Sequence, residues 1–241
     1  MGECTRINVY SSYHNNMSKH SKRYLLNQDG LQKAPHTIDA GITTIKNTRK
    51  AKFDESVEVH VKLGIDPKKS EQTVRGSFSL PHGTGKKITV AVFTNSETSK
   101  AKDEGADIIG GKDFIDEIAK TGKTNFEVAV ATPDIMKELA KIAKILGVKG
   151  LMPSPKTGTV TNDVAEAVKK IKAGQVNFRN DGAGNIHQII GKLSWEAEKL
   201  KENFIAFTNE IKRLRPKGVK GAYIEGITLS STMGPGVKIQ A

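Results

Sequence analysis

The clearest pattern in the chain is a strict alternation of apolar and polar residues over positions 57–63. The apolar positions are Val57, Val59, Val61 and Leu63, and the polar positions are Glu58, His60 and Lys62. A period of two is typical of a β-strand with one buried and one solvated face. After a turn at Asp66-Pro67 the same period returns over 74–80, so we expect a second strand that pairs antiparallel with the first.

The middle of the chain has a different pattern. Residues 88–93 and 126–131 are nearly continuous apolar runs, which are typical of strands buried on both faces. The other elements expected here are a strand at 106–109 and helices at 99–104, 114–119 and 134–146. Strands and helices that alternate through short loops predict βαβ units around a small parallel sheet.

Alternation with one polar face returns after residue 175. Val176 and Phe178 mark a strand, a turn follows at 179–182, and 186–190 is the expected partner strand. The remaining expected elements are a helix capped by Asn162 or Asp163, a long helix capped by Ser194, and strands at 222–230 and 237–239. A helix at 37–48 is expected to be short or frayed, because it contains Gly41 and several β-branched residues.

These patterns divide the chain into parts. We expect a discontinuous outer domain of residues 17–84 and 175–241, and an inserted domain of residues 85–174, with crossings at Gly83–Gly85 and Ala173–Gly174. The predicted fold class is α/β. It combines an α+β outer domain, whose antiparallel sheet is formed by both termini, with an inserted three-layer α/β domain of Rossmann-like pattern. Residues 1–16 are expected to be disordered or a misassigned N-terminal extension.

Composition adds a partner class. The chain has 38 Lys and Arg against 26 Asp and Glu, a net charge of +12 and a pI near 9.6. Such an excess favours a polyanionic partner, with a merely soluble basic protein as the alternative. Cys4 is the only cysteine, so an intramolecular disulfide is excluded. No apolar run is long enough to span a membrane, and the first 18 residues lack the apolar segment of a secretory signal.

Patterns for catalysis are absent. Gly85-Lys86-Lys87 resembles the end of a phosphate-binding loop, but Leu80 and Lys87 occupy positions that require Gly and Ser or Thr. The glycine pattern that begins at Gly182 has His187 where a dinucleotide fingerprint needs its third glycine. The six histidines lack metal-ligand spacing. We therefore expect no catalytic residues, no metal and no cofactor.

Several short motifs occur in a distinctive order. They are Ala51-Lys52-Phe53-Asp54-Glu55-Ser56-Val57-Glu58, Leu63-Gly64-Ile65-Asp66-Pro67, Val74-Arg75-Gly76, Leu80-Pro81-His82-Gly83, Ala131-Thr132-Pro133-Asp134, Gly150-Leu151-Met152-Pro153, Pro155-Lys156-Thr157-Gly158-Thr159-Val160, Phe178-Arg179-Asn180-Asp181 and Thr232-Met233-Gly234-Pro235. Together they resemble the bacterial L-one family of large-subunit ribosomal proteins, from about Met17 to the C-terminus. Each motif is weak alone, and their order and spacing carry the resemblance.

The resemblance implies a fold and a set of partners. In that family the first domain is built from both termini and the second is inserted. The implied function is that of a structural protein of the large ribosomal subunit, which binds rRNA at the mobile stalk and assists release of deacylated tRNA from the exit site. It also implies repression of the protein's own operon mRNA. The expected protein is cytoplasmic, on the ribosome, without a membrane partner, and a monomer when free.

The residues expected to contact RNA are Lys52, Phe53, Ser56, Glu58, Lys62, Arg179, His187, Thr232, Met233 and Gly234. A lysine can meet a phosphate, and an exposed Phe53 can stack on a base for roughly 1–3 kcal/mol. Ser56 and Glu58 can hydrogen-bond 2′-hydroxyl groups. Gly234 lets RNA approach the backbone, and Pro235 fixes the turn.

Each of these assignments has a simpler alternative. Phe53 could be a core residue, Glu58 part of a solvated face, and 232–236 an ordinary hairpin. Two other functions stay open at this point: a non-ribosomal RNA-binding regulator on the same fold, and an enzyme that uses the inserted α/β domain. Co-sedimentation with salt-washed large subunits would discriminate among the three.

Overall fold

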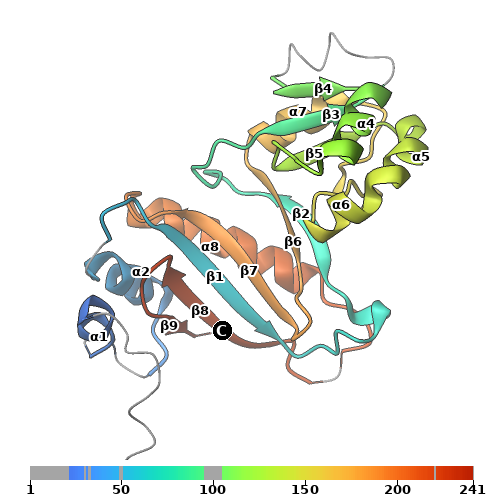
Figure 1. The fold of residues 1–241 in the computed structure, drawn as a ribbon. Coiled ribbons are helices and arrows are strands. Elements are labelled where there is room, and N and C mark those ends of the chain that lie inside the picture. Colours follow the sequence, from blue (N-terminus) through green and yellow to red (C-terminus); the bar gives the residue numbers. More distant parts are fainter. Residues whose placement is uncertain are drawn as a thin grey trace, which may run out of the picture.

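A computed structural model describes residues 22–29, 31, 34–48, 51–94, 105–219 and 221–240 (Figure 1). The extension 1–16 and the expected helix 99–104 lie outside the described residues. The helices are α1 (Lys22–Asp29), α2 (Ile38–Asn47), α4 (Lys112–Thr121), α5 (Met136–Leu139), α6 (Ala143–Val148), α7 (Val164–Lys172) and α8 (Ala197–Arg213). Short 3₁₀ helices are η3 (Ser70–Gln72), η4 (Pro133–Ile135), η5 (Ala140–Ile142) and η6 (Pro155–Thr157). The strands are β1 (Ser56–Leu63), β2 (Arg75–Ser79), β3 (Val90–Phe93), β4 (Ile108–Gly110), β5 (Val128–Ala131), β6 (Gln175–Arg179), β7 (Asn185–Lys192), β8 (Ile224–Ser231) and β9 (Val237–Ile239).

Strand β1 lies inside a four-stranded antiparallel sheet with the order β7-β1-β8-β9. Its alternating valines and Leu63 are buried, as the sequence pattern predicts. They pack against the apolar side of α8, where Leu200, Phe204, Phe207 and Ile211 recur at helical spacing. We call α1, α2, β1, β7, α8, β8 and β9 the outer unit; α8 covers one face of its sheet (Figure 1).

Helix α2 is complete over ten residues despite its poor helix formers. The Thr37 hydroxyl caps it by accepting a hydrogen bond from the Ala40 N–H. Packing explains the glycine at position 41, because a side chain there would overlap the Ile239 side chain of β9. Tertiary contact therefore compensates for the low intrinsic propensity of this segment.

Two predicted strand pairings are wrong. β2 does not pair with β1, and β6 does not pair with β7; instead β2 and β6 pair with each other in a separate antiparallel ribbon. A period of two determines which face of a strand is buried and says nothing about its neighbour. The ribbon joins the outer unit to the rest of the chain (Figure 1).

The inserted unit, from β3 to α7, is a parallel sheet with the order β4-β3-β5 among the described residues. Ala91 and Phe93 pack into one apolar cluster with α4 and residues of 135–146, while Val90 and Val92 pack into another with α7. The apolar run 88–93 thus separates two cores, which gives the predicted three layers. The described structure is mixed α/β, as the sequence predicts.

The structure differs from the sequence prediction in two helical segments. The segment 134–146 is divided among η4, α5, η5 and α6, although Ile135, Leu139, Ile142 and Leu146 form the expected buried stripe. Over so few residues the same stripe fits α and 3₁₀ turns, so periodicity does not separate them. Asp163 caps α7 as predicted, but Ser194 does not cap α8: Glu196 precedes that helix, and Ser194 bonds Asp54.

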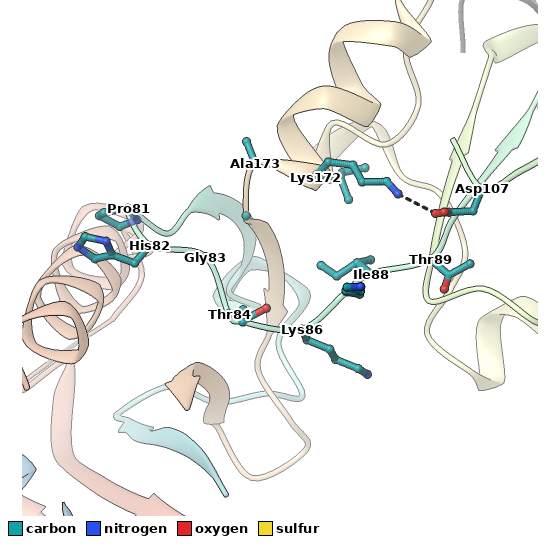
Figure 2. A pocket seen from close by; sticks show the side chains of 14 residues that line it. Pro81, His82, Gly83, Thr84, Lys86, Ile88, Thr89, Asp107, Lys172 and Ala173 are labelled. Atoms are coloured by element: carbon teal, nitrogen blue, oxygen red, sulfur yellow. Dashed lines mark hydrogen bonds and ion pairs between the residues drawn. The ribbon is translucent and has the colours of Figure 1, made fainter. Parts of the chain in front are cut away.

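The two chain crossings touch each other. Gly83, Gly85 and Gly174 all have positive φ, and a side chain on Gly174 would overlap the Cα of Gly83. A cavity of 700 Å³ opens beside them, lined by residues 81–89, Asp107 and 171–174 (Figure 2).

Each side of the crossing is anchored. On the outer side, the fully buried Asn203 donates to the carbonyls of Gly83 (3.0 Å) and Ile190 (2.7 Å) and accepts from the His82 N–H (3.1 Å). On the inserted side, Lys172 pairs with Asp107 at 2.9 Å (Figure 2). Asp107 also accepts a hydrogen bond from the Val90 N–H. We therefore expect bending between the two units to occur at residues 84–88 and 173–174.

Replacement of Asn203 by Leu should destabilise the protein. It removes the Asn203 partner from the buried Ile190 carbonyl and from the part-buried His82 N–H and Gly83 carbonyl, a cost of roughly 2–4 kcal/mol. Urea unfolding measures it, with Asn209→Leu on the exposed side of the same helix as the control. Equal stability of the two variants would contradict the anchoring role.

The glycine crossings should let the two units change their separation as rigid bodies. Spin labels at Lys120 and Lys199, in a chain with Cys4 replaced by Ser, report the distance between α4 and α8. We expect a broad or multiple distance distribution in the free protein. A single narrow distance under all conditions would count against a hinge.

Candidate nucleic-acid interface

Two loops meet at one end of the four-stranded sheet. Residues 51–56 lead into β1 and residues 231–236 follow β8, and the antiparallel pairing of Val57 with Ser231 brings them together. The Ser56 N–H donates to the Thr232 hydroxyl, and the Thr232 N–H donates to the Ser56 carbonyl, each at 3.0 Å. We call these two loops the loop end.

The loop end presents apolar side chains to solvent. Phe53 is 54% exposed and Met233 is 51% exposed. Lys52 beside them is also exposed, and so are Leu25 and Leu26 on the neighbouring α1. Phe53 is thus not a core residue. Exposed apolar groups beside a cation suit contact with a ligand that offers both flat apolar surface and negative charge.

A buried carboxylate holds the loop end in shape. Glu55 is 1% exposed and accepts hydrogen bonds from the Ser231 hydroxyl (2.6 Å) and from the N–H groups of Ala51 (2.6 Å) and Met233 (3.1 Å). The Arg23 guanidinium lies 3.4 Å from Glu55 and donates to the Met233 carbonyl at 3.2 Å. Glu55 therefore ties α1 and both loops together.

The charge of Glu55 is stabilised by these contacts. Burial alone would raise the pKa of Glu55, but the Ser231 hydroxyl, the two backbone N–H groups and Arg23 outweigh it and lower the pKa. Sequence reasoning missed this residue. The signal was present, because the alternation of 57–63 extended by two positions puts Glu55 on the buried side with Val57.

Gly234 and Pro235 shape the second loop. The Gly234 N–H donates to the Ser231 carbonyl at 3.0 Å, and a side chain on Gly234 would overlap the Ser231 hydroxyl that bonds Glu55. Pro235, the next residue, is buried. The glycine is needed for this close approach; its φ is not positive.

The polar face of the sheet continues from the loop end along β1. Glu58 comes first, followed by His60, whose Nδ1 lies 2.8 Å from Nδ1 of His187 on β7. His60 Nε2 lies 2.9 Å from the Ser230 hydroxyl, and His187 Nε2 lies 3.5 Å from Asp181. With one proton on each ring, the contacts form a chain in which Ser230 donates to His60, His60 to His187, and His187 to Asp181.

The charges of this face follow from its contacts. Burial and then the neighbouring His187 lower the pKa of His60, against the opposite effect of Glu58. The backbone N–H of Asn185 is the largest of several hydrogen bonds that lower the pKa of Asp181 to about 2, against a smaller opposing effect of desolvation. The neutral form of His60 and the ionised form of Asp181 are therefore favoured by their surroundings.

The structure groups all of the expected contact residues except Arg179 into two sets. Lys52, Phe53, Ser56, Thr232, Met233 and Gly234 belong to the loop end, with Glu58 next to it on β1. Lys62 and His187 lie farther along the same face, where Lys62 donates to the Ala183 carbonyl. Arg179 is on β6, outside this sheet.

In the part of the chain that the structure describes, no three His, Cys, Asp or Glu side chains are grouped so as to hold a metal ion. Among the same residues no helix has the length and apolar character needed to cross a membrane.

Comparison with known proteins identifies the family. The model of the ribosomal protein L1p/L10e family matches residues 45–235, which include strands β1 to β8 and nearly all of the loop end. The chain is 51% identical to the large ribosomal subunit protein uL1 of Kosmotoga olearia over 225 residues, 92% of this chain and 97% of that protein. It is 50% identical to the uL1 protein of Mesoplasma florum over 226 residues, 93% and 99% of the two chains. Because the matches run through both units, the chain belongs to the ribosomal protein L1p/L10e family.

Proposed function

We propose that this protein is a structural component of the large ribosomal subunit and binds large-subunit rRNA at the mobile stalk through the loop end. The observation that carries this proposal is the pair of exposed apolar side chains, Phe53 and Met233, fixed beside Lys52 by the buried Glu55. The similarity to relatives named large ribosomal subunit proteins supports it. A role in structure and binding, without catalysis, accounts for the site.

The chemistry of the loop end suits RNA. Phe53 offers a ring for a ribose or base, and Lys52 offers a charge for a phosphate. The hydroxyl groups of Ser56 and Thr232 and the carboxylate of Glu58 can bond 2′-hydroxyl groups, which DNA lacks. Glu58 repels phosphates, so its contact with RNA is a directed hydrogen bond.

The outer unit should carry most of the affinity. Residues 1–84 have a net charge of +5 and residues 177–241 of +4, against +3 for the residues between them. The loop end and the polar face of the sheet belong entirely to the outer unit. We therefore propose 17–84 with 175–241 as the RNA-binding domain and 85–174 as a domain inserted into it.

Two further partners belong to the proposal. An mRNA element that presents the same backbone shape would occupy the same loop end, so rRNA and the protein's own operon mRNA compete, and surplus protein represses translation. The glycine crossings permit the inserted unit to follow deacylated tRNA as it leaves the exit site. The family resemblance supports both roles.

The salt dependence of RNA binding should distinguish the contribution of apolar packing at the loop end from that of charge. With about five neutralised phosphates, log affinity should fall against log salt with a slope near −4. Phe53→Ala and Met233→Ala should each weaken binding of a stalk RNA fragment by about 5- to 100-fold with little change in slope. Lys52→Ala should make the slope shallower by about 0.7–0.9.

Ile205→Ala is the matched control for these variants, because Ile205 is an exposed apolar residue on α8. It should bind RNA like the unchanged protein. Unaltered affinity of both Phe53→Ala and Met233→Ala would rule out the loop end as the RNA surface.

Glu55→Gln should act on RNA indirectly. At neutral pH it loses part of the network and destabilises the fold by roughly 1–3 kcal/mol, and RNA binding weakens although Glu55 is buried. The lowered pKa gives the sign of the pH effect: the stabilisation by Glu55 is present above its ordinary pKa of 4.5 and is lost as the pH falls through its folded pKa.

Unfolding measured between pH 7 and pH 3 checks this prediction. The stability of Glu55→Gln should fall less steeply with acid than that of the unchanged protein. The exposed Glu225→Gln serves as control and should follow the unchanged protein. Parallel curves for all three proteins would contradict the role of Glu55.

A further inference from the structure

The ribbon of β2 and β6 has two different faces. Phe78 and Phe178 on one face pack around Phe207 of α8. The other face is polar and carries Arg75 and Arg179, which are direct cross-strand partners. Two like charges directly opposite each other on an antiparallel pair are destabilising.

Nothing in the described part of the chain neutralises these two arginines. Neither Arg75 nor Arg179 forms an ion pair or hydrogen bond with a described residue, and both are exposed. A cavity of 520 Å³ lies between this face of the ribbon and residues 147–159 of the inserted unit, and both arginines line it. Its one acidic lining residue, Glu127, already pairs with Lys86 at 2.6 Å.

The positive lining continues toward the loop end. An adjoining cavity of 370 Å³ shares Asn177 and Leu151 with the first and adds Lys149 and Lys192. Lys149 and Lys192 bond neutral oxygens: Lys149 donates to the Thr124 hydroxyl at 2.8 Å, and Lys192 to the Ser56 hydroxyl at 3.0 Å. Four cations without carboxylate partners thus line one cleft between the ribbon and the inserted unit.

This lining selects one ligand chemistry. Guanidinium groups bind phosphate oxygens through paired N–H donors, and a phosphate between two arginines replaces their repulsion with attraction. We propose that the cleft is a second phosphate-binding site, separate from the loop end, in which Arg75 and Arg179 hold phosphate groups of a polyanion. Lys149 and Lys192 extend the site toward Ser56.

The position of the site has a mechanical consequence. The arginines belong to the ribbon, which is packed on the outer unit, while residues 147–159 belong to the inserted unit. A ligand in the cleft contacts both and so restricts the bending at residues 84–88 and 173–174. The phosphates can come from RNA that continues past the loop end or from a free polyphosphate.

The test uses the full chain with Arg75→Gln and Arg179→Gln combined. Inorganic tripolyphosphate, titrated by calorimetry, should bind the unchanged protein at least tenfold more tightly than this double variant. The matched control is Lys137→Gln with Lys141→Gln, which removes the same charge from exposed positions that line neither cavity. The control should stay within twofold of the unchanged protein.

A second readout identifies the source of the phosphates. If RNA occupies the cleft, the double variant lowers the salt slope of RNA binding by about 1.4–1.8, for two phosphates. If the slope is unchanged while tripolyphosphate binding is lost, the ligand is a free polyphosphate. The RNA arm rests on the proposed function; the tripolyphosphate arm does not, so failure of RNA binding at Phe53 and Met233 leaves it intact.

Stability separates a binding role from a structural one. Because Arg75 and Arg179 repel each other, the double variant should be at least as stable as the unchanged protein in urea. The proposal is overturned if the double variant and the unchanged protein give the same tripolyphosphate titration, or if neither binds it. If the double variant loses as much free energy of unfolding in urea as it loses free energy of tripolyphosphate binding, the arginines have a structural role. That result would also overturn the proposal.

Discussion

The structure depends on the placement of β1 between two strands from the last third of the chain. Because β7 and β8 flank β1, the sheet closes only after the chain has left the outer unit, formed the inserted unit and returned. Both passages must cross at nearly one place, and there Gly83 and Gly174 touch. Asn203 of α8 bonds two backbone groups at the crossing, the His82 N–H and the Gly83 carbonyl, and also the Ile190 carbonyl of β7. The discontinuous architecture is therefore a consequence of one strand's neighbours.

The same sheet explains how exposed apolar side chains are kept in a fixed arrangement. A loop residue such as Met233 has little packing of its own to hold it. Glu55 fixes the conformation of the two loops, because its buried carboxylate accepts hydrogen bonds from both loops and pairs with Arg23 of α1. A buried charge is costly unless it is fully bonded, so the network forms completely or is lost. The surface that meets RNA in our proposal is thus determined by a residue that never reaches the surface.

Charge is distributed over two places with different surroundings. At the loop end, Lys52 is exposed beside apolar groups, and on the neighbouring face Glu58 and Asp181 partly balance the cations. In the cleft, Arg75, Arg179, Lys149 and Lys192 have no carboxylate partner among the described residues. The first place suits recognition by shape and directed hydrogen bonds, and the second suits bare phosphate. The ribbon of β2 and β6 carries the two arginines of the second place.

The sequence by itself determined the faces of the elements and the family. Alternation over 57–63 identified the buried side of β1, the apolar run 88–93 identified a strand between two cores, and the ordered motifs identified the family. The same motifs predict that the loop-end residues contact RNA. Only the tertiary structure decided which strands are neighbours: β2 with β6, and so Arg75 opposite Arg179. It also decided that Glu55 has donors 176 and 178 residues away. The physical reason is that periodicity records whether a side chain meets core or water, whereas a partner depends on contacts between distant segments, which a local pattern does not contain.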